Sequence, residues 1–165
     1  MFSSKTNEWA TPESLFRKLN NVFNFTLDPC STDENHKCKK YYTKKENGLL
    51  QDWGGESVFV NPPYGREIHR WIEKSYNESR KKGTVVVCLI PARTDTIYWH
   101  NYCMKAYEIY FIKGRIKFEN EEYKPSPAPF PSAVIVFKSD LTPIFTGGNF
   151  PKIHSMNLKK LGEGK

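Results

Sequence analysis

The chain has 165 residues and an excess of basic side chains, with 25 Lys and Arg against 18 Asp and Glu and a formal net charge of +7. This length is sufficient for the core of one domain, and an aromatic content of 15% argues against intrinsic disorder. The longest strongly apolar run, Val85 to Ile90, is far shorter than the roughly 20 residues that span a bilayer. The first five residues lack the apolar segment of a signal peptide. These features exclude a membrane span and a secreted disulfide scaffold, and they predict a cytoplasmic protein.

The chain contains four irregularly spaced cysteines, which favours free thiols in a reducing compartment: Cys30, Cys38, Cys88 and Cys103. Cys30, His36 and Cys38, or His100 with Cys103, have the residue types of zinc ligands. Neither set has the paired C-x2-C spacing of a structural zinc site. We therefore expect no bound metal.

The first predicted element is a helix over residues 11–23. Thr11 is a good N-cap and Pro12 fits the first helical turn. Apolar residues then recur at helical spacing: Leu15, Phe16, Leu19, Val22 and Phe23. A short strand over residues 25–27 follows, and it should end before Pro29, which cannot donate a hydrogen bond to a sheet. Residues 31–53 show no such periodicity.

Two apolar runs that end at prolines predict the central strands. Residues 57–60 form a short run before Pro62 and Pro63. Residues 84–90 form a longer β-branched run, which is typical of a strand buried on both faces of a parallel sheet. Between them, residues 67–82 have the spacing of an amphipathic helix, and Gly83 is its expected C-cap.

The remaining elements complete an alternation of helices and strands. A second helical stretch is expected at about residues 94–105, and strands are expected at 108–112, 116–118 and 132–137. This order predicts an α/β fold with three layers and a mostly parallel sheet, in one compact domain over residues 1–150. Residues 151–165 are expected to form a basic, loosely held C-terminal tail.

The segment with the clearest chemistry is Asn61-Pro62-Pro63-Tyr64, directly after the predicted strand 57–60. Ligands of open α/β sheets bind at the carboxyl ends of strands. The Asn61 amide oxygen and the Pro62 carbonyl can accept hydrogen bonds from an exocyclic amine on a planar base, which localises the lone pair of the amine nitrogen. Tyr64 offers a ring on which the base can stack, a contact worth about 1–3 kcal/mol. A rigid turn that closes a strand is the alternative interpretation.

Asn61 to Tyr64 resembles the NPPY motif of amino-methyltransferases that use S-adenosylmethionine. The whole chain resembles the phage-type DNA N6-adenine methyltransferases over residues 9–138. The resemblance rests on the order of several further pieces: Trp9-Ala10-Thr11-Pro12, Leu27-Asp28-Pro29-Cys30, Asn47 to Leu49 with Asp52-Trp53, Pro91-Ala92-Arg93-Thr94, Gly114-Arg115 and Pro129-Phe130-Pro131.

The resemblance implies a single Rossmann-like methyltransferase domain that binds S-adenosylmethionine and releases S-adenosylhomocysteine. Asp28 could hold the methionine ammonium, although the loop lacks the G-x-G of commoner methyltransferases. The Thr11 hydroxyl and the start of the following helix could bind the methionine carboxylate, and Asp52 could contact the cofactor adenine or ribose. The full set of expected cofactor contacts is Trp9, Thr11, Pro12, Asp28, Pro29, Cys30, Asp52 and Asn61. For Thr11, Asp28 and Asp52, an N-cap, an Asp-Pro turn and a solvated loop acid are the respective alternatives.

The resemblance also implies direct methyl transfer to adenine N6 in double-stranded DNA, with the base flipped out of the duplex. The net charge of +7 fits a polyanionic partner. Candidate DNA contacts are Lys39, Lys40, Tyr41, Arg93 and Arg115, and ordinary surface ion pairs or a solvated loop are the alternatives. No obligate protein partner is evident, and the resemblance places the enzyme in the cytoplasm of a bacterial host of a phage or prophage.

Two other functions fit the same residues. The Asn-Pro-Pro-Tyr chemistry suits any planar amine or amide, so the acceptor could be an RNA adenine, a cytosine N4 or a protein glutamine. A basic DNA-binding module without catalysis is the second alternative. The two classes differ in one measurable property, because the module would bind DNA but not S-adenosylmethionine.

Overall fold

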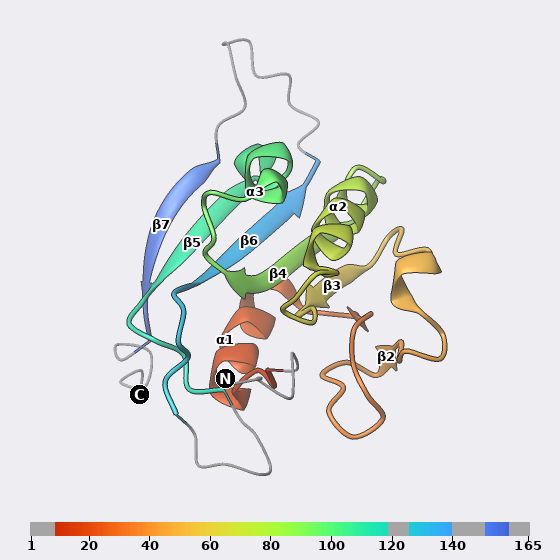
Figure 1. Cartoon of the computed structure of the whole chain (residues 1–165). Coiled ribbons are helices and arrows are strands. Elements are labelled where there is room, and N and C mark those ends of the chain that lie inside the picture. The colour runs from red at the N-terminus through yellow and green to blue at the C-terminus, as the bar shows by residue number, and fades with distance from the viewer. Residues whose placement is uncertain (1–8, 119–125, 140–150, 159–165) are drawn as a thin grey trace.

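A seven-stranded sheet with helices on both of its faces organises the chain (Figure 1). The computed structural model describes residues 9–118, 126–139 and 151–158. The strands follow the order β2-β1-β3-β4-β6-β5-β7 across the sheet. Their bounds are β1 (Leu27–Asp28), β2 (Lys40–Tyr41), β3 (Ser57–Val60), β4 (Val85–Pro91), β5 (Glu108–Lys113), β6 (Ser132–Lys138) and β7 (Lys152–Asn157).

The sheet is mostly parallel, as the sequence predicts. Only β6 among these strands runs against its neighbours, being antiparallel to both β4 and β5, whereas the other pairings are parallel. The carboxyl ends of β3, β4 and β5 therefore meet at one edge of the sheet, where β6 begins. This edge, called the carboxyl edge below, is where α/β sheets bind their ligands.

The described residues also form three α-helices and two 3₁₀ turns. Their bounds are α1 (Glu13–Phe23), η1 (Gly48–Leu50), α2 (Ile68–Ser79), α3 (Ile97–Asn101) and η2 (Cys103–Lys105). None of the helices in the described part of the chain is long and apolar enough to cross a membrane.

Helices α1 and α2 cover opposite faces of the sheet. The ring of Phe59 on β3 contacts Phe16 of α1, with centroids 5.2 Å apart. The ring of Phe137 on β6 contacts Tyr76 of α2, with centroids 6.1 Å apart. Phe59 and Phe137 stand beside successive residues of β4 in the register. Because successive strand residues point to opposite faces, the fold has the three layers that the sequence predicts.

Several helix ends differ from the prediction. Pro12 occupies the N-cap position of α1, which has no side-chain cap, and the Thr11 hydroxyl instead bonds to Asn61. Helix α2 ends at Ser79 with Arg80 as C-cap, so Gly83, with φ of 73°, lies in the turn beyond it. The stretch expected as one helix over residues 94–105 is divided into α3 and η2.

The C-terminal region also differs from the prediction. Strand β7 lies within the segment expected to be a loose tail, and it pairs in parallel with β5 over six residue pairs, from Glu108–Lys152 to Lys113–Asn157. In Figure 1 it forms one margin of the sheet. In contrast, the strand expected at residues 116–118 is reduced to one bridge between Lys117 and Pro127.

Candidate active site

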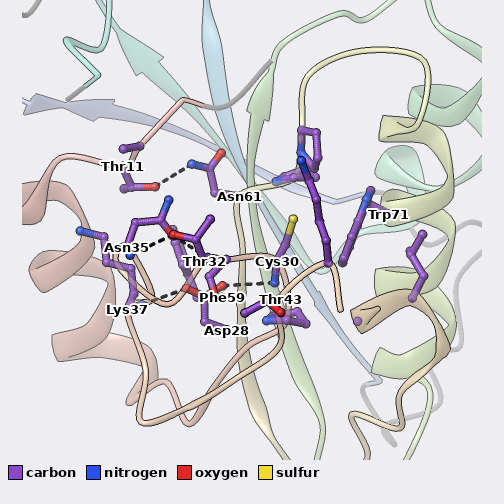
Figure 2. Close-up of a pocket in the computed structure, with 18 of the residues that line it drawn as sticks. Thr11, Asp28, Cys30, Thr32, Asn35, Lys37, Thr43, Phe59, Asn61 and Trp71 are labelled. Atoms are coloured by element: carbon purple, nitrogen blue, oxygen red, sulfur yellow. Dashed lines mark hydrogen bonds between the residues drawn. The ribbon is translucent and has the colours of Figure 1, made fainter. Parts of the chain in front are cut away.

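A pocket of about 980 Å³ lies at the carboxyl edge of the sheet (Figure 2). Its walls come from four parts of the chain, namely residues 9–11, the loop that begins with Asp28, residues 43–49, and the segment from Asn61 to the first turns of α2. Pockets for small molecules measure roughly 300–1,000 Å³. The pocket is therefore large enough for a nucleotide-sized ligand.

Asn61 stands at one end of the pocket with its amide orientation set by two groups from the N-terminal segment. The Asn61 Nδ2 donates to the carbonyl oxygen of Trp9 and to the Thr11 Oγ1, which is 2.9 Å away. A backbone carbonyl can only accept a hydrogen bond, so the nitrogen must face Trp9. The Asn61 Oδ1 is left buried and has no hydrogen-bond partner among the described residues.

The rest of the Asn-Pro-Pro-Tyr segment is divided between the pocket and the core. Pro62 and Pro63 line the pocket beside Asn61. Tyr64 is 7% exposed, and its hydroxyl donates to the Leu89 carbonyl oxygen at 3.0 Å. Burial raises the pKa of this phenol well above its usual value. The structure thus places the Tyr64 ring in the core and not on the pocket wall, where the sequence analysis expects it.

Asp28 lines the pocket at the end of β1 and organises the loop that follows. Its Oδ1 accepts from the backbone N–H of Cys30 at 3.3 Å, and its Oδ2 accepts from that of Lys37 at 2.9 Å. The carboxyl group is only 3% exposed, and burial raises its pKa despite these two hydrogen bonds, which lower it. A cationic ligand group would stabilise the buried carboxylate.

Pro29 and Gly48 form a tightly packed part of the pocket wall. Gly48 approaches the Pro29 backbone without room for a side chain, and the Gly48 carbonyl accepts from Trp53 Nε1 at 3.0 Å. Asn47 adopts a left-handed conformation with φ of 55°, and its Oδ1 accepts from the Leu49 N–H. The Asn-Gly-Leu segment is thereby held against the loop after β1.

Several lining residues were not among the sequence-based candidates. Phe59 and Trp71 add apolar walls, and Lys37 and Arg70 add cationic groups. Each cation has a carboxylate partner, because Lys37 Nζ lies 3.1 Å from Glu13 and Arg70 lies 2.8 Å from Glu67. The sequence could have indicated Trp71 and Arg70 as pocket residues, because they belong to the first turns of the helix that follows Pro63.

Two expected cofactor contacts lie outside the pocket. Asp52 is highly exposed, with its carboxylate 2.8 Å from Lys81, and the hydrogen bond to Lys81 lowers its pKa. It does not line the pocket, and its contact with the cofactor stays a prediction. Pro12 caps α1 and is also not a lining residue. Trp9, Thr11, Asp28, Pro29, Cys30 and Asn61 are brought together on the pocket wall.

The expected DNA contacts separate into two groups. Arg93 follows β4 and Arg115 follows β5, so both exposed side chains lie at the carboxyl edge. Lys40 belongs to β2 and lies 2.6 Å from Glu56, near the start of β3. The neighbouring Tyr41 hydroxyl donates to Asp33 at 2.9 Å, and Lys39 is exposed beside them. Arg93 and Arg115 lie beyond the ends of β4 and β5, at the edge that holds the pocket, and Tyr41 ends β2 level with Asp28.

The described residues contain no cluster of three or more His, Cys, Asp or Glu side chains that could hold a metal ion. All four cysteines are unpaired with one another, and burial raises the pKa of Cys38 and Cys88 to about 12. Of the four, only Cys30 lines the pocket. The chemistry of the site therefore rests on Asn61, Asp28 and the groups around them.

Comparison with known proteins gives one family and two informative relatives. A family model described as DNA N-6-adenine-methyltransferase (Dam) matches residues 2–159. A protein named DNA N-6-adenine-methyltransferase from Haemophilus phage HP1 is 34% identical over 118 residues, which cover 69% of this chain and 67% of that protein. A protein of the same name from Escherichia phage T1 is 28% identical over 122 residues, which cover 72% of this chain and 50% of that protein.

Proposed function

Because the chain belongs to the Dam family of DNA N-6-adenine-methyltransferases, we propose that it transfers a methyl group from S-adenosylmethionine to the N6 amine of adenine in DNA. The observation that carries the proposed mechanism is the buried Oδ1 of Asn61 at the carboxyl edge, which has no hydrogen-bond partner in the described part of the chain. A buried acceptor without a partner costs about 1–3 kcal/mol. An exocyclic amine would supply the missing donor.

The amide of Asn61 acts as a preorganised acceptor. Trp9 and Thr11 hold its nitrogen, so its oxygen keeps one direction without reorganising when the substrate arrives. With the Pro62 carbonyl as a second acceptor, two hydrogen bonds draw the amine nitrogen toward tetrahedral geometry. The lone pair is then available for transfer and no longer conjugated with the ring.

The lining of the pocket supports S-adenosylmethionine as the methyl donor. The buried carboxylate of Asp28 suits the methionine ammonium, and the Thr11 hydroxyl at the start of α1 suits the carboxylate. Pro29, Phe59 and Trp71 offer apolar surface to the adenine ring. When bound, S-adenosylmethionine supplies a methyl group on a cationic sulfur, a donor that needs no nucleophilic Ser or Cys. Orientation by these residues would provide the remaining catalysis.

DNA is the proposed substrate at this edge, in the cytoplasm of a bacterial host. The target base must leave the duplex to reach Asn61, so base flipping is part of the proposal. Arg93 and Arg115 stand where phosphates could contact the protein. The family and the net charge of +7 favour DNA adenine over a protein glutamine. RNA adenine and cytosine N4 remain the alternatives with the same local chemistry.

The test of this function is methyl transfer by wild type and by Asn61→Ala. Wild type should place labelled methyl groups in DNA and not in RNA or protein. Asn61→Ala should abolish transfer and keep measurable S-adenosylmethionine binding in calorimetry. Asn21→Ala, on the exposed face of α1, is the matched control and should behave as wild type. Near-normal turnover of Asn61→Ala would contradict the assignment.

A further inference from the structure

Strand β6 begins with a buried hydroxyl that makes no hydrogen bond to any residue the structure describes. Ser132 is 2% exposed, and its Oγ has no hydrogen-bond partner among the described residues. The next five residues are apolar and buried. An unpaired buried hydroxyl destabilises the folded state. If Ser132 had only a packing role, an alanine at this position would make the fold more stable. Such exceptions in a native protein call for an explanation outside the fold.

Ser132 lies on the same face of the sheet as Asn61. Phe137 contacts α2 on one face, and Ser132 precedes it by five residues on the same strand. Because strand residues alternate between faces, Ser132 points to the opposite face, which α1 covers. Asn61 is bonded to Thr11, immediately before α1. Both unpaired groups therefore belong to the α1 side of the sheet.

The two residues also flank the same strand end. Ser132 pairs with Pro91, the last residue of β4, and Asn61 follows β3, the other neighbour of β4. The strands that carry them are two spacings apart, about 10 Å. Asn61 follows Val60, which pairs with Cys88, whereas Ser132 pairs with Pro91, so Ser132 stands about two residues farther along. A backbone separation of roughly 12 Å leaves room between the two side chains for one purine ring with a hydrogen bond of about 3 Å at each end.

Aromatic rings connect the two groups. Trp9, whose carbonyl holds Asn61, has its ring centroid 5.4 Å from that of Phe130, two residues before Ser132. Phe130 is 5.5 Å from Tyr64, and Phe118 contacts Trp9 at 5.5 Å. Aromatic side chains are the surfaces on which unstacked bases are held. The rings of Trp9 and Phe130, which are close in the chain to the groups that contact Asn61 and to Ser132, are thus of the kind that holds a base.

We propose that Ser132 is a further contact for the target base and donates its hydroxyl to adenine N3. This inference rests on the proposed function, in which Asn61 accepts from the N6 amine. N3 lies opposite the carbon that carries N6, so it is the ring acceptor farthest from Asn61. In cytosine the position opposite the amine-bearing carbon is the nitrogen attached to the sugar, which cannot accept. Ser132 would therefore select adenine over cytosine, a distinction that Asn61 alone cannot make.

Entry of the base requires the rings to part. Tyr64 contacts Phe130 and Phe118 edge to face, and its hydroxyl is bonded to Leu89. A planar purine inserted between these rings replaces edge contacts by stacked ones, and a Tyr64 side chain released from Leu89 becomes free to stack on the base. Ser132 is thus a substrate-binding residue whose partner arrives with the flipped nucleotide.

The test is a double-mutant cycle between protein and base. Single-turnover methylation is measured for wild type and Ser132→Ala on a duplex that wild type methylates, with adenine, 3-deazaadenine or 7-deazaadenine at the target. Wild type should be about tenfold slower on 3-deazaadenine than on adenine, the effect of one lost hydrogen bond. Ser132→Ala should be about tenfold slower on adenine and no slower again on 3-deazaadenine. Replacing adenine by 7-deazaadenine should change the methylation rates of wild type and Ser132→Ala by the same factor.

Stability and a matched variant separate binding from a structural role. Ser132→Ala should unfold at the same temperature as wild type or higher, because it removes an unpaired buried hydroxyl. Ser75→Ala is the control, since the buried Ser75 Oγ donates to the Trp71 carbonyl at 2.7 Å. Ser75→Ala should lower the unfolding temperature. The ratio of its methylation rates on adenine and 3-deazaadenine should equal that of wild type.

The outcomes distinguish this inference from the proposed function. If wild type methylates no DNA, the proposed function fails. If it methylates DNA but the effects of Ser132→Ala and 3-deazaadenine multiply to about a hundredfold, only the Ser132 contact fails. Equal wild-type rates on adenine and 3-deazaadenine would also overturn the contact, and this measurement needs no variant.

Discussion

Gly48 lies so close to Pro29 that a β-carbon on Gly48 would stand 2.0 Å from the Pro29 carbonyl oxygen. This contact joins the η1 segment to the loop after β1, and both residues line the pocket. The atom that a side chain would meet belongs to the backbone, so it cannot move aside as the end of a flexible side chain could. The shape of the pocket wall therefore depends on the absence of a side chain at position 48.

Gly48→Ala should destabilise the fold and weaken cofactor binding together. Overpacking of this kind costs about 1–3 kcal/mol, and relief of the clash must displace Pro29 or Gly48 from the pocket wall. Urea unfolding and calorimetric titration with S-adenosylhomocysteine measure the two effects. Gly54→Ala is the control, because its β-carbon would meet only side-chain atoms of Asp52 and Lys81, at 3.1 Å and 3.4 Å. If Gly48→Ala has the stability and the S-adenosylhomocysteine affinity of wild type, the close contact with Pro29 determines neither property.

Thr11→Val should slow methylation more than it alters folding. The substitution keeps the shape of a fully packed side chain and removes the oxygen that accepts from Asn61 Nδ2. Loss of one buried hydrogen bond costs about 1 kcal/mol, and the freed amide loses part of its orientation, so we expect about a tenfold lower single-turnover rate. Thr11→Ser restores the acceptor and should recover most of the rate. A Thr11→Val rate equal to wild type would exclude this positioning role.

Affinity for S-adenosylhomocysteine, which carries the same ammonium, should fall as the pH is lowered. Burial raises the Asp28 pKa above 3.8, so its carboxyl group takes up a proton at a higher pH than an exposed Asp. The protonated form no longer attracts the ammonium, and ligand binding must then release that proton. Titration calorimetry in buffers from pH 7 downward measures the effect. Asp28→Asn should bind S-adenosylhomocysteine weakly, and its affinity should not show this dependence on pH.

Protonation of Asp28 at low pH should weaken ligand binding but should not weaken the fold. A carboxyl group whose pKa is raised in the folded state loses stabilising influence as the pH rises, so protonation of Asp28 does not itself unfold the chain. Folding followed by circular dichroism at each pH therefore serves as the control. If the affinity of wild type and Asp28→Asn changes in parallel with pH, Asp28 is not the ammonium partner.

Arg93 and Arg115 should contribute to DNA affinity through phosphates. The slope of log K against log salt is negative, and each lost phosphate contact lowers its magnitude by about 0.9. Arg93→Ala and Arg115→Ala should therefore each weaken binding at low salt and reduce the slope by about one contact. The measurement is fluorescence anisotropy with a labelled duplex across a range of salt concentrations.

Lys40→Ala provides the matched charge control, because Lys40 is paired with Glu56 away from the carboxyl edge. It should leave the salt slope unchanged, although it removes the same single charge. Equal effects of all three substitutions would indicate a response to net charge alone and would contradict a specific role for the two arginines.

Elements with strong local patterns were predictable from the sequence. The apolar run at residues 57–60 coincides with β3, and the periodic segments at residues 11–23 and 67–82 contain helices α1 and α2. Such patterns predict structure because a strand or helix must turn its apolar side chains to one face wherever it packs. The ends were less predictable. Thr11 and Gly83 are good capping residues, but contacts from distant parts of the chain decide whether a cap is used.

The sequence by itself determined the residue types of the site and their order along the chain, including Asn61 with its two prolines and Asp28 before Pro29. Only the tertiary structure decided what those residues touch. Asn61 is oriented by Trp9, 52 positions away, Tyr64 is turned into the core, and Asp52 is directed to Lys81. Local periodicity carries no information on contacts between distant segments, because those depend on how the packed layers meet.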